Sequence, residues 1–281
     1  MDKQLIQQFI KQALAEDIGD GDHSTLATIP ATKKGKCHLL VKENGIIAGI
    51  EAAKEIFKII DPKFKVTVFI KDGEHVKIGD IAFIVEGNSQ KLLTAERLVL
   101  NTMQRMSGIA TTTHNIVESL KGTHTKVLDT RKTTPNLRFL EKWAVTIGGG
   151  VNHRTGLYDM ILIKDNHIDY AGGIANALNA AHQYVKERKK LPIVIEVRNL
   201  DELKQVIAVG GVERILLDNF TFPLLKKAIK LINGKFITEA SGGITPENAR
   251  KYANCGVDYI SMGALTHSVK SLDMSLKAIK K

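Results

Sequence analysis

The sequence predicts an α/β protein in which a small N-terminal α+β domain precedes a β/α barrel. Two observations lead to this prediction. Residues 37–87 hold short β-like runs separated by glycines, a pattern typical of an antiparallel sheet. From residue 126 onward, short apolar runs alternate with helical segments of roughly ten or more residues, and this βα repeat indicates a parallel sheet.

The N-terminal domain, residues 1–108, is expected to open with an amphipathic helix. Apolar residues recur there at helical spacing, at positions 5, 6, 9, 10, 13 and 14. The β-like runs that follow are CHLLVKE, IIAGI, FKVTVFI and IAFIVEG, with Gly73, Gly79 and Gly87 as turns. Residues 94–120 then return to a helical pattern.

The second domain, residues 109–269, is expected to be a small or incomplete barrel. Its six candidate strands are KVLDT, MILIKD, IVIEV, RILLD, FITEAS and YISMG. A doubly wound sheet is the alternative arrangement of the same βα units. Residues 270–281 are expected to form a C-terminal helix that packs on the N-terminal domain.

The amino-acid composition narrows the kinds of molecule that the protein is expected to bind. Lys and Arg outnumber Asp and Glu by 40 to 30, a net charge of +10, which suits polyanions or a solvated lysine-rich surface. Basic residues do not interleave with aromatic ones, so a nucleic-acid platform is not expected. Cys37 and Cys255 lack zinc-type spacing, and no apolar run has the length of a signal peptide or membrane span. We therefore expect a cytoplasmic protein with no membrane partner.

Polar residues end the candidate strands of the barrel. In β/α barrels the carboxyl ends of the strands carry the chemistry, so six such endings in register predict a site. The endings are, in chain order, Arg131 with Lys132, Lys164 with Asp165, Glu196, Asp218, Glu239 and Gly263.

Three basic elements occur in the first half of this barrel. Arg131 and Lys132 follow the first strand, and His153 and Arg154 follow three glycines in GGGVNHR. A guanidinium matches a carboxylate with a planar fork, whereas lysine is a compact charge. Lys164 ends the next strand, where a Schiff-base lysine is a second interpretation.

Two glycine-rich loops late in the chain predict a phosphate site. In EASGGITPENAR, Ser241, Gly242 and Gly243 lead into a helix that opens with Thr245 and Pro246. Backbone N–H groups at such a helix start bind anions. One βα unit later SMGALTHS supplies a second loop, as in phosphate-binding barrels.

These segments resemble one family. LLTAERLVLNTMQRMSGIAT, DTRKTTPNLRFLEKWAV, GGGVNHR, ILIKDNH, LLDNF, EASGGI and SMGALTHS resemble, in order, the signature segments of quinolinate phosphoribosyltransferases. EDIGDGDHST near the start matches as well, so the resemblance spans nearly the whole chain. The departures are Asn136, where the family often has glycine, and Trp143, where it often has tyrosine.

The resemblance implies a reaction and an assembly. The reaction moves a phosphoribosyl group from phosphoribosyl pyrophosphate to quinolinate, with loss of carbon dioxide and pyrophosphate, and gives nicotinate mononucleotide for NAD biosynthesis. It implies Mg²⁺ as cofactor. It also implies an N-terminal sandwich domain, an open barrel and a homodimer in which each N-terminal domain covers the partner's barrel mouth; a higher oligomer is left open.

The resemblance also implies roles for particular residues. Lys132, Lys164, Glu196 and Asp218 are the expected catalytic residues, and Glu196 and Asp218 are expected to meet Mg²⁺ largely through the substrate. The dicarboxylate and nearby phosphates are expected to contact Arg97, Arg131, Lys132, His153, Arg154 and Lys164. Ribose hydroxyls and the 5′-phosphate are expected at Glu196, Asp218, Glu239, Ser241, Gly242, Gly243, Gly263 and His267.

Three other functions are open at this point. One is a related enzyme that uses a different pyridine carboxylate. Another is a Schiff-base aldolase, which would trap substrate carbon on Lys164 under borohydride. The third is a nucleic-acid-binding protein, whose affinity would fall steeply with salt.

Overall fold

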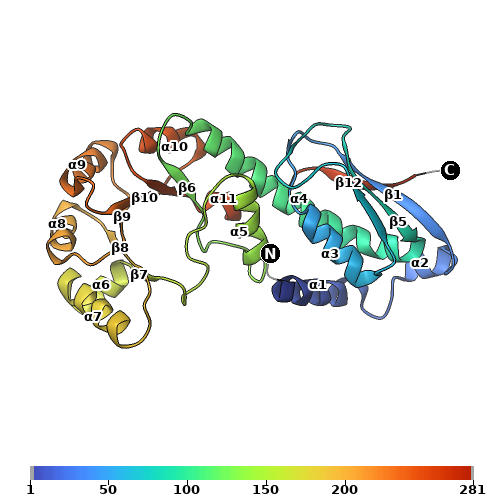
Figure 1. Cartoon of the computed structure of the whole chain (residues 1–281), viewed down its shortest axis with the longest axis horizontal. Helices are drawn as coiled ribbons and strands as arrows, with labels where there is room; N and C mark the ends of the chain where they lie inside the picture. The colour runs from blue at the N-terminus through green and yellow to red at the C-terminus, as the bar shows by residue number, and fades with distance from the viewer. Residues whose placement is uncertain (1–2, 280–281) are drawn as a thin grey trace. The chain divides into compact units, whose positions relative to one another are not determined.

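The computed structural model describes residues 3–279 and divides them into two compact units. Unit 1 comprises residues 3–114, 134–149 and 268–279, and unit 2 comprises residues 115–133 and 150–267. Residues 1–2 and 280–281, the outer ends of the first and last expected segments, lie outside the described residues. The two units are drawn in Figure 1.

Unit 1 is built on a four-stranded antiparallel sheet in the order β12-β1-β5-β3. Its strands are β1 (Lys34–Val41), β3 (Lys65–Val68), β5 (Ile81–Asn88) and β12 (Met274–Ala278). The short strands β2 (Gly45–Ile46) and β4 (His75–Val76) pair separately. Helices α1 (Lys3–Ile18) and α2 (His23–Thr28) precede the sheet, and α4 (Ser89–Ser119) follows it. The expected opening helix, antiparallel sheet and long helix are confirmed.

One helix of unit 1 was not expected. Only Ile46 of the run IIAGI lies in a strand, β2, and α3 (Ile50–Ile60) begins at the last residue of that run. The backbone N–H of Ile50 donates to Oδ1 of Asp72 at 2.8 Å, so a distant side chain caps the helix. Ile50, Ala53 and Ile56 are buried on one face. The sequence pattern did not predict α3 because its helical periodicity covers few residues and because Asp72, which caps the helix, lies elsewhere in the chain.

The expected C-terminal helix is wrong. Residues 274–278 form β12, which pairs antiparallel with β1, Met274 opposite Val41 and Leu276 opposite Leu39. Met274 and Leu276 are buried while Ser275 and Lys277 are more exposed, which is the period-two alternation of a strand. The preceding helix α11 (Ala264–His267) has only four residues.

Unit 2 is a six-stranded parallel sheet in the order β6-β11-β10-β9-β8-β7. The strands are β6 (Lys126–Leu128), β7 (Ile161–Ile163), β8 (Ile193–Val197), β9 (Arg214–Asp218), β10 (Ile237–Ser241) and β11 (Tyr259–Ser261). The helices between them are α6 (Asp165–Ala171), α7 (Ile174–Glu187), α8 (Leu200–Val209), α9 (Phe222–Ile232) and α10 (Pro246–Ala253).

The strand order decides between the two expected architectures. Strands β7 to β11 are neighbours in chain order, and Figure 1 shows α7, α8 and α9 side by side along the outer side of this sheet. A doubly wound sheet would reverse its order partway. Among the described strands β6 and β7 have no pairing with one another, so the incomplete barrel is confirmed.

The chain crosses between the units more often than the predicted boundary at residues 108 and 109 allows. Helix α4 runs without a break through that boundary, and residues 115–119 of it count with unit 2. Helix α5 (Arg138–Ile147), which follows the first barrel strand, packs in unit 1 instead of beside the sheet. Just before it, Asn136 has a φ of 65°, a left-handed conformation that Asn tolerates and glycine favours.

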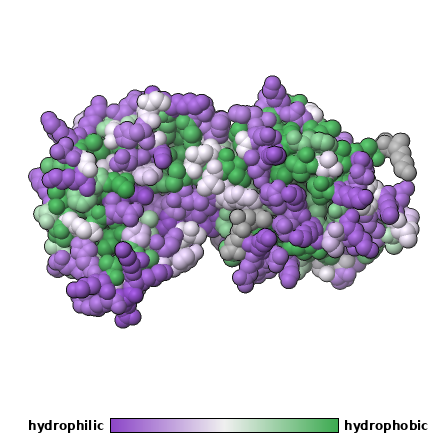
Figure 2. Space-filling view, in the orientation of Figure 1, coloured by the Kyte–Doolittle hydropathy of each residue, from purple (hydrophilic) through white to green (hydrophobic). Residues whose placement is uncertain are grey.

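The face drawn in Figure 2 is mainly hydrophilic. Figure 2 shows hydrophilic side chains spread over the visible face of each unit, with smaller apolar areas between them. Among the helices of residues 3–279, none combines the length and the apolar character that crossing a bilayer requires.

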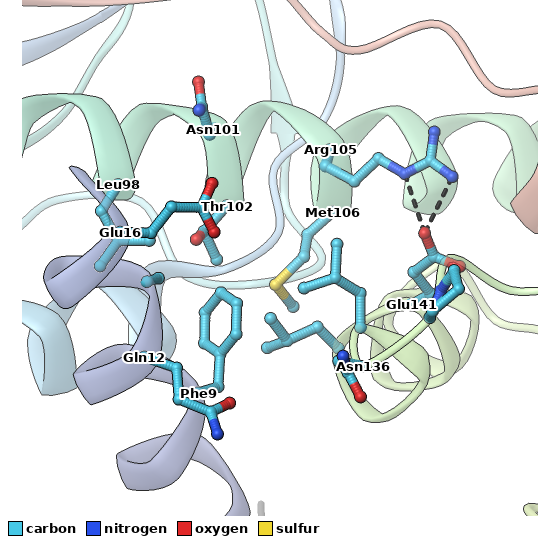
Figure 3. A pocket seen from close by; sticks show the side chains of 14 residues that line it. Phe9, Gln12, Glu16, Leu98, Asn101, Thr102, Arg105, Met106, Asn136 and Glu141 are labelled. Atoms are coloured by element: carbon cyan, nitrogen blue, oxygen red, sulfur yellow. Dashed lines mark hydrogen bonds and ion pairs between the residues drawn. The ribbon is translucent and has the colours of Figure 1, made fainter.

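A cavity of about 400 Å³ lies within unit 1, between α1, α4 and the start of α5. Figure 3 shows Phe9 of α1 and Met106 of α4 turned toward one another across it. At one side Arg105 donates to Oε1 of Glu141 at 2.9 and 3.1 Å. Glu141 is 1% exposed, and its Oε2 also accepts from the backbone N–H of Thr134. The cavity contains none of the expected site residues.

We expect Arg105→Met to destabilise unit 1. The variant leaves the buried Glu141 carboxylate without its guanidinium, and breaking such a pair costs about 2–3 kcal/mol after allowance for the partial exposure of Arg105. Urea unfolding measures the loss. The double variant Arg105→Met/Glu141→Gln removes both charges and should lose less; a loss of under about 0.5 kcal/mol in the single variant would show that the pair contributes little.

Candidate active site

Unit 2 holds a cavity of about 760 Å³ at the carboxyl ends of its parallel strands. Thirteen of the fourteen residues expected at the site line it, all except Arg97. They are Arg131, Lys132, His153, Arg154, Lys164, Glu196, Asp218, Glu239, Ser241, Gly242, Gly243, Gly263 and His267. Sequence positions spread over residues 131–267 therefore meet in one space.

Strand register explains why these side chains share the cavity. Leu216 of β9 is paired with Glu196 of β8 on one side and with Glu239 of β10 on the other, so the three lie in one layer. Paired residues in neighbouring strands point to the same face. Asp218 and Ser241 are paired two residues further on, one layer nearer the strand ends.

The basic side of the cavity comes from β6, β7 and the segment after Val151. The 3.0 Å backbone bond from Met262 to Leu128 and the 2.7 Å bond from the Thr266 hydroxyl to the carbonyl of Lys132 hold the Arg131 loop. Burial lowers the pKa of the Arg154 guanidinium, and the nearby charge of Arg131 lowers it further. Two guanidinium groups facing one space favour a ligand with several negative charges.

The acidic side consists of Glu196 and Asp218. Burial raises the pKa of each carboxyl above its usual range; Lys164 opposes this at both sites, and Asp218 adds to it at Glu196. Nζ of Lys164 lies 3.4 Å from Oε2 of Glu196. A cation bound between the two carboxylates would stabilise their ionised forms.

Glu239 differs from Glu196 and Asp218 because its side chain is fully buried. Its Oε2 accepts from Nη1 of Arg214 at 2.8 Å and lies 3.3 Å from Nε2 of His153. Burial raises the pKa of Glu239, but His153 and Arg214 together outweigh it, and the net shift is downward. Glu239 is therefore a carboxylate held below the cavity surface by two basic side chains.

The Ser-Gly-Gly loop has the geometry expected of a phosphate loop. Thr245 is the N-cap of α10 in a capping box with Asn248, and Pro246 occupies the first turn. Gly242 has a φ of 93° and packs against Asn219, where an added Cβ would come within 2.1 Å of Oδ1. Gly243 has a φ of 61°, and an added Cβ would meet nothing within 4 Å. Gly242 thus shapes the loop, and Gly243 faces open space.

Two residues are placed elsewhere. Arg97 is exposed on α4 in unit 1 and does not line the cavity. His167 accepts the backbone N–H of Lys164 on Nδ1 at 3.0 Å, which closes a capping box at the start of α6. His167, which belongs to the segment ILIKDNH, therefore has a structural contact at the start of α6.

Sequence reasoning missed three residues around the cavity. Asn219 lines it with a φ of 54° and donates to Oδ2 of Asp218 at 2.6 Å. Asp129 is fully buried and accepts the backbone N–H of His153 at 2.8 Å. Arg214 reaches Glu239 from the start of β9. The sequence contains a signal for two of them: Asn219 in DNF is an amide, and Asp129 in LDT a carboxylate, directly at the end of a strand. No such local signal points to Arg214.

Among the described residues, no three His, Cys, Asp or Glu side chains gather as a metal site. Glu196 and Asp218 form a pair of oxygen donors only. Mg²⁺ keeps several waters and binds through one or two carboxylates together with substrate phosphates. The pair therefore fits a cation that arrives with a polyphosphate substrate and does not fit a closed protein site.

Known proteins match almost the whole chain. The family model described as quinolinate phosphoribosyl transferase, C-terminal domain, matches residues 109–277, and the N-terminal domain model matches residues 22–107. A quinolinate phosphoribosyltransferase [decarboxylating] of Nicotiana tabacum is 46% identical over 97% of this chain and 82% of its own length. A probable nicotinate-nucleotide pyrophosphorylase [carboxylating] of Bacillus subtilis is 41% identical, over 96% of this chain and 92% of its own.

Solved structures match as well. The crystal structure of NadC from Streptococcus pyogenes superposes with a TM-score of 0.94 and 38% identity, covering 100% of this chain and 99% of that one. A nicotinate-nucleotide pyrophosphorylase from Francisella tularensis gives a TM-score of 0.93 at 37% identity, over 99% and 98% of the two chains.

Proposed function

The chain belongs to the quinolinate phosphoribosyltransferase family, and we propose on this basis that it makes nicotinate mononucleotide for NAD biosynthesis. The phosphoribosyl group of phosphoribosyl pyrophosphate moves to the ring nitrogen of quinolinate, and pyrophosphate and carbon dioxide leave. The gathering of thirteen expected residues in one cavity supports this proposal most directly.

The two sides of the cavity suit the two substrates. Quinolinate carries two adjacent carboxylates, which bidentate guanidinium groups such as those of Arg131 and Arg154 bind with defined geometry. Lys132 and Lys164 add compact positive charge. The Ser-Gly-Gly loop offers backbone N–H groups to the 5′-phosphate. In this proposal the carboxylates of Glu196 and Asp218 accept hydrogen bonds from the ribose hydroxyls.

Catalysis in such a cavity consists mainly of positioning and electrostatics. The anomeric carbon takes on positive charge as pyrophosphate leaves, and the carboxylates of Glu196 and Asp218 stabilise that charge. Holding the ring nitrogen close to that carbon removes much of the entropic barrier. The bond between the ring and the carboxylate next to the nitrogen then breaks and carbon dioxide leaves. The electron pair stays on that ring carbon, where the positive pyridinium and a nearby basic side chain stabilise it, and the carbon then takes a proton from water.

Mg²⁺ is the cofactor in this proposal. Glu196 and Asp218 would hold it together with the substrate phosphates, and it would neutralise charge on the leaving pyrophosphate. Lys132 and Lys164, which line the same cavity, would balance the remaining negative charge of the phosphates.

The reaction itself is the test. Incubation with quinolinate, phosphoribosyl pyrophosphate and Mg²⁺ should release nicotinate mononucleotide and carbon dioxide in equal amounts. Nicotinate and other pyridine carboxylates, assayed in parallel, are the controls for a related enzyme with a different acceptor. No product from quinolinate, with turnover of another acid, would contradict the proposal.

We expect Arg154→Lys to raise the KM for quinolinate about tenfold, because lysine keeps the charge but cannot form the planar two-bond fork. Steady-state kinetics with each substrate varied in turn measures this. The KM for phosphoribosyl pyrophosphate serves as the internal control. Unchanged kinetics would mean that Arg154 acts only as a diffuse charge.

The two loop glycines should respond differently. Gly242→Ala forces a Cβ against Asn219, so we expect a lower Tm and weaker binding of both substrates. Gly243→Ala shares the strain of a positive φ but places its methyl in open space of the cavity. It should raise the KM for phosphoribosyl pyrophosphate more than that for quinolinate. If Gly243→Ala raises both KM values equally, the loop is not part of the phosphate site.

The assembly and the location are also part of this proposal. A homodimer with shared sites gives Arg97, which is exposed on unit 1, a role in the partner's cavity. We propose a cytoplasmic enzyme, although plant relatives are named as mitochondrial or chloroplastic. Sedimentation equilibrium tests the dimer, and cell fractionation tests the location.

A further inference from the structure

A chain of buried polar contacts runs from Arg214 at the start of β9 into the wall of the unit 2 cavity, which Glu239, His153 and Arg154 line. Arg214 donates to Glu239 at 2.8 Å, and Glu239 lies 3.3 Å from Nε2 of His153. Nδ1 of His153 accepts the backbone N–H of Arg154 at 2.7 Å. Each of Arg214, Glu239 and His153 is at most 8% exposed.

These contacts define the state of the His153 ring. Because Nδ1 accepts the backbone N–H of Arg154, this geometry assigns the ring proton to Nε2. Nε2 then donates to the carboxylate of Glu239. The backbone N–H of His153 is held separately by Asp129 at 2.8 Å. The ring and the backbone of His153 are therefore both fixed.

Arg214 is fixed on two sides as well. Register pairs Arg214 with Ile237, two residues before Glu239, so the two side chains lie on the same face of neighbouring strands. The guanidinium carbon lies 4.6 Å from the centroid of the Tyr259 ring, on the strand beyond Glu239. A cation over an aromatic face and a charge-assisted hydrogen bond together orient the guanidinium.

We infer that Arg214 and Glu239 are positioning residues for the dicarboxylate side of the site. Glu239 holds the Nε2–H tautomer of His153, His153 holds the backbone of Arg154, and Arg214 keeps the Glu239 carboxylate in place. This assignment rests on the proposed function, since it names Arg154 as a substrate contact. It gives Glu239 a role other than direct ribose binding, in agreement with its complete burial.

A purely stabilising ion pair is the competing explanation. Buried ion pairs contribute little net stability compared with apolar residues of the same size, so stability alone is a weak reason for this pair. The hydrogen-bond partners that orient a metal-binding histidine change metal affinity or activity by about 10–100-fold, and partners that orient His153 are expected to act by the same principle. The test must therefore separate substrate affinity from stability.

Arg214→Met tests the inference, with Arg214→Lys as the conservative variant. We expect Arg214→Met to raise the KM for quinolinate about tenfold while that for phosphoribosyl pyrophosphate stays within about twofold. Lysine restores the charge next to Glu239 and should recover at least about a third of the lost affinity. An equal rise in both KM values, or no rise in a folded Arg214→Met, would overturn the inference.

Imidazole ¹⁵N NMR gives a readout that needs no substrate. His153 in the unmodified protein should show an unprotonated Nδ1 and a protonated, slowly exchanging Nε2, and Arg214→Met should lose this single-tautomer pattern. An unchanged pattern would overturn the inference even if quinolinate turnover is confirmed. Failure of the unmodified protein to use quinolinate would instead reject the proposed function and leave the tautomer result intact.

Two further variants act as controls. Arg250→Met removes another arginine of unit 2, which donates to the carbonyls of Ser119 and Lys121 and does not line the cavity; both KM values should stay unchanged. If Arg214→Met does not fold, Arg214→Met/Glu239→Gln leaves no unpaired buried charge and takes its place. Its KM for quinolinate should still exceed that of the unmodified protein by about threefold, and an unchanged value would overturn the inference.

Discussion

Arg131→Ala should lower kcat/KM for quinolinate by about a hundredfold or more, the size expected for loss of a preorganised charged contact. Arg131 follows β6 and lines the cavity, close enough to Arg154 to lower the pKa of that guanidinium. Removal leaves Arg154 as the remaining arginine of unit 2 that lines the cavity and can hold a ligand with two adjacent carboxylates. Initial rates at several concentrations of each substrate measure the effect.

A matched control separates this effect from a general loss of positive charge. Arg188, at the C-cap of α7 in the same unit, is exposed and does not line the cavity. Arg188→Ala should keep activity within about twofold, because surface substitutions away from specific contacts have small effects. If Arg131→Ala also keeps activity within twofold, Arg131 is not part of the site.

Co-expression of Arg97→Ala with Lys164→Ala should restore activity that neither variant has alone. In the proposed homodimer each site takes Arg97 from one chain and Lys164 from the other. A mixed dimer then has one site with both lesions and one intact site. Random pairing makes half of the dimers mixed, so about a quarter of the activity of the unmodified protein should return.

The pair Arg131→Ala and Lys164→Ala is the matched control for this experiment. Both residues line the cavity of unit 2, so every unit 2 in a mixed dimer carries a lesion and no activity should return. Different affinity tags on the two chains verify that mixed dimers form. Purified mixed dimers of the Arg97 pair that remain inactive would exclude a shared site, whether or not the reaction is the one proposed.

The carboxyl-end rule for parallel strands located most of the cavity in advance. Arg131, Lys164, Glu196 and Asp218 each stand at the end of an apolar run, and parallel strands bring all such ends to one edge. Arg97 falls outside that rule because it lies on α4, and nothing within one chain places it at the cavity. Its role depends on the assembly and stays a prediction.

Residues that act from below the cavity could not be found in this way. Arg214 opens β9, at the end opposite to the site, and its partner Glu239 is 25 positions later. Only the lateral register of β9 against β10 brings them together. Asn219 likewise limits the space for a side chain at Gly242, because the loops that follow β9 and β10 are in contact. Such contacts are absent from local sequence patterns.

By itself, the sequence determined the alternating strands and helices of unit 2 and the polar residues at the strand ends, because hydrophobic periodicity and strand direction are local properties. The tertiary structure alone decided three other features: β12 pairs with β1, α5 joins unit 1, and Arg214 supports Glu239 and His153. Each depends on which surfaces meet after the chain has folded, and pairing between distant segments is set by burial and register across the whole domain.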